Sequence, residues 1–298
     1  MARIPSREFG RTGLVVPALG YGCTAVGRGV VSEDEAARLL NGAVDLGLRL
    51  LDTARSYGLS EERIGRHLAH RRSEIILSTK VGYGVDGYED WTGPCVSAGI
   101  DRALRVLRTE SIDIVCLHSC PLETLRRGEV TGALLRAREA GKIRVAAYSG
   151  DNEALRWAVD SGHFGGVETS YSLCDQASRV NGSLARAAVV GIGVIAKRPL
   201  ANAPWRAGPH DPDDSAAAAY RSRWASFRQD LGDTPADEVA LRFAVYEPGV
   251  NGAIVGSSSL EHLRADVDAV ARGPLPAELV EALHAWFAEH GAAWDGMI

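Results

Sequence analysis

The sequence predicts an α/β fold in which eight parallel strands close into a barrel surrounded by helices, the (β/α)8 or TIM barrel. Short apolar runs alternate with longer segments of helical period, a pattern typical of a parallel sheet covered by helices. A chain of 298 residues accommodates eight such units, since these barrels usually need about 250 residues. No linker-like change of composition occurs, so we expect one domain over residues 1–298. The predicted strands are 16–22, 48–54, 74–81, 112–118, 145–150, 166–173, 193–200 and 252–257.

The segments between these runs carry helix signals. Ser32 and Glu35 have the spacing of a capping box before a stretch whose apolar residues recur on one face. Ser60 is the expected N-cap of the next helix, with two glutamates in its favourable first turn. Residues 201–235 form the longest interruption, which we expect to be an insertion after the seventh strand, and residues 275–294 predict an extra C-terminal helix.

Composition and charge narrow the classes of function. The net charge of −5, without any block of like charge, argues against a nucleic-acid or membrane surface and favours a small-molecule partner. The five cysteines are odd in number and scattered, so a disulfide framework is not expected. Residues 1–15 lack the apolar core of a signal peptide, and no apolar segment approaches the roughly 18 residues of a membrane span. We therefore expect a cytoplasmic protein.

Two short motifs suggest other chemistry but fit it poorly. GYGCTA at 20–25 matches a dinucleotide-binding fingerprint, yet the helix that such a motif requires begins only after Ser32. Cys116, His118 and Cys120 would share one face of the fourth strand, but neighbouring side chains on that face are about 6.6 Å apart, which makes convergence on one zinc ion difficult. We expect no metal site.

A third set of residues converges on one end of the predicted barrel. Asp52 ends the second strand, Lys80 the third and His118 the fourth, while Tyr57 lies in the loop after the second strand. Barrel enzymes keep their chemistry at this carboxyl-terminal rim. Asp52 and Lys80 alone could be a structural ion pair. Tyr57 adds a phenol, and a neighbouring ammonium should lower the pKa of that phenol and make it a usable general acid.

These motifs resemble the aldo-keto reductase family. The similarity is carried by DTARSYGLSEERIG, LSTKVG and LHSC, and it extends over almost the whole chain through REFGRTGLVVPALGYG, GKIRVAAYSG, ETSYSL, IAKRPL and AIVGSSSLEHLRADV. The resemblance implies an N-terminal hairpin and a catalytic tetrad of Asp52, Tyr57, Lys80 and His118, with Tyr57 as proton donor. It also implies NADPH across the barrel mouth and hydride transfer to a small aldehyde, ketone or sugar carbonyl, or the reverse oxidation of an alcohol.

The resemblance further implies a cofactor site with three departures from the family pattern. Gly150 stands where the family usually has asparagine, Glu168 replaces a glutamine, and Lys197 with Arg198 replaces an aromatic residue; Glu168 and Lys197 could pair with each other. Serines before a helix suit a phosphate, and with His262 near the position of the basic contact to the 2′-phosphate we expect NADP, with NAD as the alternative. The expected cofactor-binding residues are Gly22, Cys23, Thr24, Asp52, Ser149, Gly150, Glu168, Tyr171, Lys197, Arg198, Pro199, Leu200, Gly256, Ser257, Ser258, His262, Arg264 and Asp266.

The substrate pocket is less defined by the resemblance. Ser119 follows the fourth-strand histidine, where the family often has tryptophan, so the sequence does not name the substrate. Two other functions stay open: a cofactor-binding regulatory or sensor protein with vestigial activity, and a sugar dehydratase or epimerase on the same barrel. The candidate pocket residues are Tyr21, Tyr57, Trp91, His118, Ser119 and Trp205.

Overall fold

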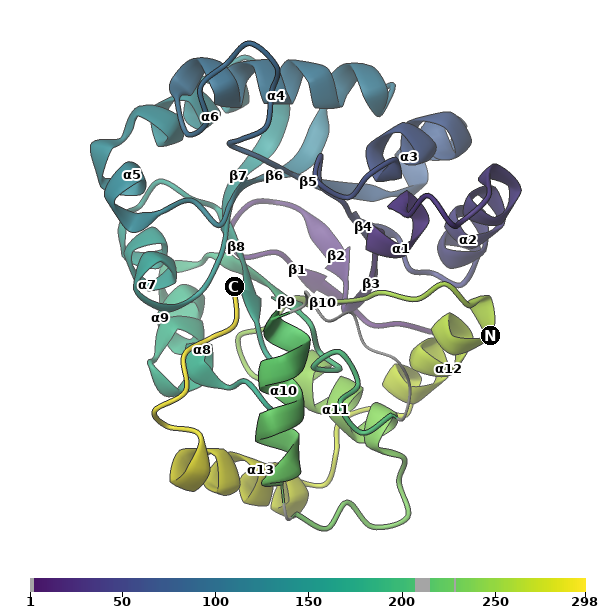
Figure 1. Cartoon of the computed structure of the whole chain (residues 1–298). Coiled ribbons are helices and arrows are strands. Elements are labelled where there is room, and N and C mark those ends of the chain that lie inside the picture. Colours follow the sequence, from purple (N-terminus) through teal and green to yellow (C-terminus); the bar gives the residue numbers. More distant parts are fainter. Residues whose placement is uncertain (1–2, 207–214, 228) are drawn as a thin grey trace.

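The barrel predicted from the sequence is present. The computed structural model describes residues 3–206, 215–227 and 229–298, and within them eight strands close into a parallel barrel in the order β10-β3-β4-β5-β6-β7-β8-β9 (Figure 1). Pairing of Ala253 on β10 with Leu19 on β3 closes the ring. Each strand overlaps its predicted range, and only β7 begins earlier, by two residues. The strands are β3 (Leu19–Gly22), β4 (Leu50–Asp52), β5 (Ile76–Val81), β6 (Ile112–His118), β7 (Ile143–Ser149), β8 (Gly166–Ser170), β9 (Gly193–Lys197) and β10 (Gly252–Val255).

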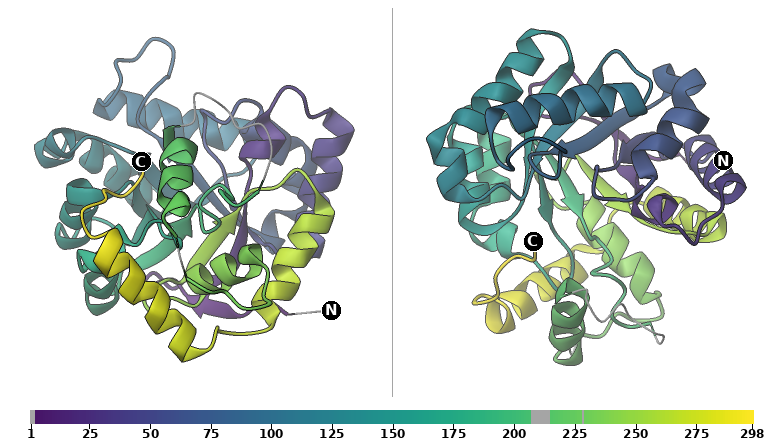
Figure 2. Two further views of the ribbon diagram at one scale, coloured as in Figure 1. Left: turned by 60° about the horizontal axis from the view of Figure 1, so that its bottom comes forward. Right: turned by 45° about the horizontal axis from the view of Figure 1, so that its top comes forward.

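Helices surround the barrel in both views of Figure 2. The capping box of Ser32 and Glu35 opens the second helix as predicted. Ser60 is wrong as an N-cap, because its hydroxyl is buried and donates to the carbonyl of Cys23, 2.9 Å away; the N-cap is Leu59. The helices are α1 (Thr24–Gly27), α2 (Glu33–Asp45), α3 (Ser60–Leu68), α4 (Gly93–Val106), α5 (Leu122–Arg127), α6 (Glu129–Glu139), α7 (Asn152–Asp160), α8 (Ala177–Val180), α9 (Ser183–Val190), α10 (Ser215–Ala225), α11 (Ala236–Val245), α12 (Leu260–Ala271) and α13 (Ala277–His290), with a 3-10 turn at Ala69–Glu74.

The predicted insertion after the seventh strand and the predicted C-terminal helix are both found among the described residues. The insertion after β9 contains α10, and residues 207–214 and 228 of it lie outside the described part. The predicted C-terminal helix is α13. None of the described helices is long and apolar enough to cross a bilayer.

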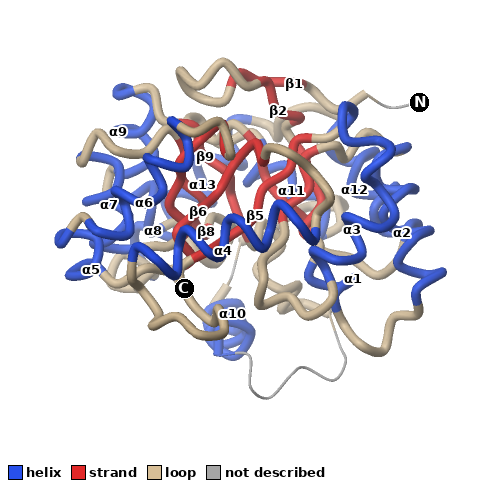
Figure 3. The backbone as a smooth tube through the Cα atoms, turned by 90° about the horizontal axis from the view of Figure 1, so that it is seen from above, coloured by secondary structure: helices blue, strands red, loops and turns tan. Residues whose placement is uncertain are grey.

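A hairpin of β1 (Ser6–Glu8) and β2 (Val15–Pro17) closes the amino-terminal end of the barrel, opposite α10 (Figure 3). Phe9, just after β1, is fully buried and belongs to the cluster that fills the barrel interior. Gly166 and Gly193, which begin β8 and β9, make room for its ring, since a Cβ at either position would lie 2.7 or 2.4 Å from it. The hairpin is therefore the floor beneath the residues at the opposite rim.

We expect Phe9→Ala to destabilise the fold by about 3–5 kcal/mol, the usual cost of a large-to-small change in a closed core. Denaturant unfolding followed by circular dichroism measures this loss. Val15→Ala on the same hairpin is the matched control, because Val15 is 57% exposed and its truncation should cost less than about 1 kcal/mol. Equal losses for the two variants would contradict a plugging role for Phe9.

Candidate active site

The strand ends bring Lys80 against two carboxylates. The Lys80 ammonium donates to Asp52 Oδ2 and to the carbonyl oxygen of Thr53, the latter at 3.1 Å, and it lies 3.5 Å from Oε2 of Glu168 on β8. All three charged side chains are buried. Asp52 also accepts a hydrogen bond of 2.9 Å from Ser78 Oγ. Three strands that are distant in sequence thus meet at one buried ammonium.

Burial and mutual contact set the charges of this group. Burial and the nearby Glu168 raise the pKa of Asp52 to about 7, although Lys80 opposes them. Burial alone would raise the pKa of Glu168, but Lys80 and Lys197 outweigh it and hold that pKa below its usual value. Burial alone would lower the pKa of Lys80, yet Asp52 and Glu168 raise it well above its usual value. Lys80 therefore stays charged at neutral pH.

Tyr57 lies beside this ammonium, with Lys80 Nζ 5.0 Å from the centre of its ring. The expectation of a lowered pKa is wrong: burial raises the pKa of Tyr57 to about 12, and the lowering effect of Lys80 is smaller. The nearby carboxylates of Asp52 and Glu168 raise it further. The Tyr57 side chain is accordingly a neutral phenol, which can give up a proton but does not hold a negative charge.

His118 is edge-on to Tyr57, with the ring centres 6.1 Å apart. Burial and the charge of Lys80 lower the pKa of His118 to about 3, so its imidazole is neutral. Tyr83 stacks on that imidazole, and the Tyr83 hydroxyl lies 3.0 Å from Nδ1. The Tyr83 hydroxyl is also placed to donate to Ser56 Oγ at 3.3 Å. When it donates to Nδ1 instead, the imidazole proton is on Nε2.

The sequence reasoning missed Tyr83. Its signal is a position three residues after Lys80, in the loop that follows the third barrel strand. That position does not reveal the direction of the ring. In the structure Trp91 lies close over Gly82, and its ring contacts that of Tyr83 in a tilted arrangement with the ring centres 5.5 Å apart.

The match to known proteins agrees with this geometry. The model of the Aldo/keto reductase family matches residues 18–286. The chain belongs to the aldo/keto reductase family. It is 29% identical to the L-galactose dehydrogenase of Arabidopsis thaliana over 292 residues, which are 91% of this chain and 89% of that one. It is 31% identical to the L-glyceraldehyde 3-phosphate reductase of Escherichia coli over 220 residues, 65% of this chain and 61% of that one.

A solved structure of the family has the same fold along nearly the full length. The holo form of an aldo-keto reductase from Bacillus halodurans superposes with a TM-score of 0.81 at 26% identity, covering 95% of this chain and 96% of that one. Relatives named as dehydrogenases and reductases, together with the family match, make this member of the aldo/keto reductase family a carbonyl oxidoreductase.

In this aldo/keto reductase Glu168 and Lys197 each have another direct ion-pair partner, although the charge of Lys197 also lowers the pKa of Glu168. Lys197 pairs with Asp151 at 3.0 Å, while Glu168 lies against Lys80 and accepts a hydrogen bond of 3.2 Å from Ser149. The physical reason is strand geometry. Glu168 is inside the barrel with Lys80, whereas Lys197 ends β9 beside the loop after β7, where Asp151 is buried.

The glycine at position 150 has a local cause. A Cβ on Gly150 would lie 2.2 Å from the hydroxyl of Tyr148, so an asparagine would collide with that buried tyrosine. The Gly150 amide instead donates to the carbonyl of Glu168 at 3.0 Å. This departure from the family pattern therefore fits the packing of β7 and does not by itself open the site.

Three expected site residues are fully buried and serve packing. Tyr171 stacks on Phe243 of α11 and donates to Glu247 at 2.6 Å, so its side chain points toward the layer of helices. Tyr21 donates to the carbonyl oxygen of Ser257 at 2.7 Å and so ties β3 to the segment after β10. Cys23 is a buried thiol whose pKa burial raises well above its usual value. The expected cofactor contacts of Tyr171 and Cys23, and the expected pocket contact of Tyr21, stay predictions.

The remaining predicted residues line the rim. Thr24, Gly256 and Ser258 are exposed, and Ser257 is partly so. Ser259 is the N-cap of α12, whose first turns expose His262 and Arg264, and Asp266 follows. Burial and the nearby Asp237 raise the pKa of Asp266 to about 7. After β9, Arg198, Pro199 and Leu200 lead into the insertion, where Arg198 donates to the hydroxyl of Ser170 and the carbonyl of Met297.

The aromatic residues of the candidate pocket, together with Tyr83, have two kinds of surroundings. Trp91, Tyr83, His118 and Tyr57 form a continuous series of ring contacts. Trp205 instead donates to Asp237 of α11 at 2.8 Å and contacts Trp224 of α10. Ser119, next to His118, has a left-handed backbone with φ of 56°.

Cys116 and Cys120, the candidates for a zinc site, are free buried thiols. Burial raises the pKa of both. Within the described ranges no group of three or more histidine, cysteine or acidic side chains could hold a metal ion.

The loop that carries Tyr57 rests on Gly27 of α1. A Cβ on Gly27 would lie 1.6 Å from the Tyr57 carbonyl oxygen, and the Gly27 carbonyl accepts the amide of Leu59 at 3.0 Å. We expect Gly27→Ala to displace this loop and lower kcat/KM at least about tenfold, because small misplacements of a catalytic group are costly.

Gly29→Ala is the matched control, since a Cβ there meets no atom within 4 Å. Steady-state kinetics of the two variants, with thermal unfolding to verify folding, provides the comparison. If folded Gly27→Ala retains the activity of Gly29→Ala, Gly27 does not position Tyr57.

Proposed function

We propose that the chain is an NAD(P)H-dependent oxidoreductase that reduces a small aldehyde, ketone or sugar carbonyl, or oxidises the corresponding alcohol, with Tyr57 as general acid/base. The observation that carries the proposal is the neutral phenol of Tyr57 beside the buried ammonium of Lys80 and the neutral imidazole of His118. A phenol, an ammonium and an imidazole in one cleft suit proton transfer to a carbonyl oxygen.

The roles of the four residues follow from their charges. Tyr57 gives its proton to the carbonyl oxygen, and the Lys80 ammonium stabilises the negative charge that develops on the tyrosine. Asp52 keeps Lys80 in place. His118, with its proton on Nε2, donates a hydrogen bond to the substrate oxygen and orients it. The nicotinamide, when bound, supplies or accepts the hydride.

Several residues fit such a cofactor. Oε2 of Glu168 is buried and accepts no hydrogen bond from the described residues, so it is available to an amide N–H. Ser149 would hold the same amide group, while Ser257, Ser258 and the N-terminus of α12 suit a phosphate. Exposed His262 and Arg264 favour NADP, with NAD as the alternative.

The substrate class rests on two relatives. Their names, an L-galactose dehydrogenase and an L-glyceraldehyde 3-phosphate reductase, point to polyhydroxylated carbonyl compounds. For this reason, keto-sugars and aldoses are the first candidate substrates to test for a change in absorbance at 340 nm. Conversion of a sugar without change in absorbance at 340 nm would instead favour the dehydratase or epimerase alternative, and tight nucleotide binding without turnover would favour the sensor.

We expect Tyr57→Phe to lower kcat by at least about a hundredfold, the usual scale for loss of a general acid, while the Kd for NADPH stays within about threefold. Absorbance at 340 nm and fluorescence titration measure the two quantities. Tyr88→Phe is the matched control, because Tyr88 is an exposed phenol in the loop after β5. Near-normal turnover of Tyr57→Phe would refute the mechanism.

A further inference from the structure

Glu168 adds a second carboxylate beside the Lys80 ammonium, which already pairs with Asp52. Lys80 donates to Asp52 and lies 3.5 Å from Glu168 Oε2, so its single positive charge serves two negative groups. Lys197 also lowers the pKa of Glu168, but its own ion-pair partner is Asp151 at 3.0 Å, and Arg198 binds the Ser170 hydroxyl and the Met297 carbonyl.

The groups that surround Glu168 inside the barrel do not neutralise it. His118 is neutral because its pKa is about 3, and burial raises the pKa of Cys116 well above its usual value, so that thiol is neutral too. Ser149, on the adjacent strand β7, donates one hydrogen bond to Oε1. Oε2 is left with the shared ammonium of Lys80 and no hydrogen-bond donor among the described residues.

We propose that Glu168 makes this site bind the oxidised nicotinamide in preference to the reduced one, an inference that rests on the proposed function. An oxidised nicotinamide ring carries a positive charge and a reduced ring carries none. A buried carboxylate therefore attracts only the oxidised ring, and buried sites screen that attraction weakly. A glutamine would accept the same hydrogen bond but would not distinguish the two redox states by charge.

Isothermal titration calorimetry with NADP+ and NADPH, on the wild-type chain and on Glu168→Gln, tests the proposal. We expect the ratio Kd(NADPH)/Kd(NADP+) to fall at least about tenfold in Glu168→Gln, as expected for one charge roughly 10 Å away at an intermediate dielectric. The titrations are carried out at pH 8.5. Asp52, with a pKa of about 7, is then ionised in both proteins and contributes the same charge.

Glu123→Gln, an exposed carboxylate on α5, is the matched control and should leave the ratio unchanged. Glu168→Ser also removes the charge and must shift the ratio in the same direction, which covers a failure of Glu168→Gln to fold. An unchanged ratio in folded variants overturns the inference while leaving the proposed function intact. If the wild-type chain binds neither NADP+ nor NADPH, the proposed function is overturned instead.

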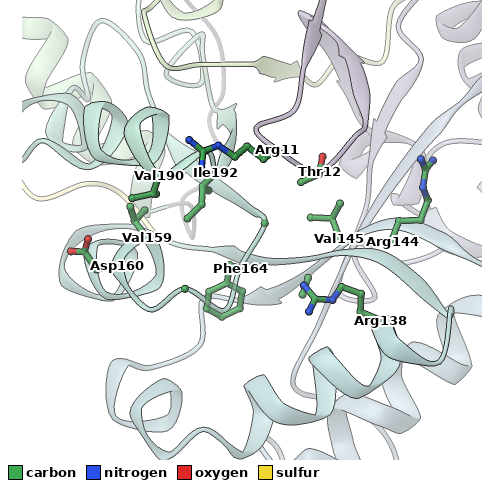
Figure 4. Close-up of a pocket in the computed structure, with 14 residues that line it drawn as sticks. Arg11, Thr12, Arg138, Arg144, Val145, Val159, Asp160, Phe164, Val190 and Ile192 are labelled. Carbon is green, nitrogen blue, oxygen red and sulfur yellow. The ribbon is translucent and has the colours of Figure 1, made fainter.

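A second feature, independent of Glu168, lies at the other end of the barrel. A pocket of about 420 Å³ opens at the amino-terminal ends of β7, β8 and β9, beside the turn of the hairpin (Figure 4). Its apolar lining residues include Val159, Phe164 and Ile192, and its charged lining residues include Arg11, Arg138 and Arg144.

Positive charge in this pocket exceeds its negative charge. Asp160 pairs with Arg186 at 2.7 Å, and Arg144 pairs with the buried Asp113 at 2.9 Å. Arg11 and Arg138 form no ion pair within the described part of the chain.

Arg11 is also held in place. Its amide donates to the Gly191 carbonyl at 2.8 Å, and its side chain crosses Gly191, where a Cβ would lie 2.5 Å from Arg11 Cδ. The backbone of Arg11 and the stem of its side chain are therefore fixed at the edge of the pocket, while the residue itself is exposed.

We propose that this pocket binds a small molecule with an apolar body and one anionic group, such as a sulfonate, carboxylate or phosphate. The apolar lining buries the body, and Arg11 and Arg138 bind the anion. Arginine forms charge-assisted, bidentate hydrogen bonds with such oxygens. The pocket is at the amino-terminal end of the strands, whereas Asp52, Lys80 and His118 are at the carboxyl-terminal end.

Two fluorescent probes that differ in charge test this site: 1-anilinonaphthalene-8-sulfonate and its neutral analogue N-phenyl-1-naphthylamine. We expect the sulfonate to bind the wild-type chain more tightly, and Arg11→Gln/Arg138→Gln to raise its Kd at least about tenfold without changing the Kd of the neutral probe. Arg105→Gln/Arg108→Gln, which removes two exposed charges outside the pocket, is the control. Equal sulfonate affinity in both double variants, or no sulfonate binding to the wild-type chain, overturns the proposal.

Discussion

The pairing of the buried Lys80 ammonium is the interaction on which the carboxyl-terminal end of the barrel depends. An unpaired charge in a protein interior is prohibitively costly, so Lys80 requires Asp52 from β4 and gains Glu168 from β8. Those residues are 28 and 88 positions away in sequence, and only closure of the barrel brings them together. Correct strand order is therefore required to complete this charge group. Burial has the largest effect on the protonation of Tyr57 and His118, and the charges of this group modify it.

The rim above Lys80, Asp52 and Glu168 includes residues other than glycine in the left-handed backbone conformation. Ser119, Asn152 and Arg198 have positive φ angles of 56°, 59° and 54°, and each lies within three residues of the end of β6, β7 or β9. A left-handed backbone at a residue other than glycine is uncommon and unfavourable, and such residues gather at functional sites. The closed barrel and the hairpin plug around Phe9 hold the strands firmly enough to impose these turns at the mouth.

The sequence predicts the strands and their order well, and also the convergence of Asp52, Lys80 and His118, because apolar runs of strand length end on these residues and the barrel brings those ends together. It predicts side-chain environment poorly. The pKa of Tyr57 was expected to fall because Lys80 is near, yet burial dominates, and burial is a property of the packed structure. The partner of Glu168 likewise depends on whether a side chain points into the barrel or toward the adjacent loop.

The same geometry links the charge of Tyr57 to the redox state of a bound nicotinamide, if the proposed function holds. Burial, with a smaller contribution from Asp52 and Glu168, raises the pKa of Tyr57, so with an uncharged reduced ring nearby Tyr57 is a neutral phenol and a proton donor. A positively charged oxidised ring opposes those carboxylates and lowers the pKa of Tyr57, which makes the phenolate required for alcohol oxidation more accessible. With Glu168 present, Tyr57 is therefore not restricted to the role of acid or of base. Under the proposed function, the reduced nicotinamide favours its neutral, acid form and the oxidised nicotinamide favours its phenolate, base form.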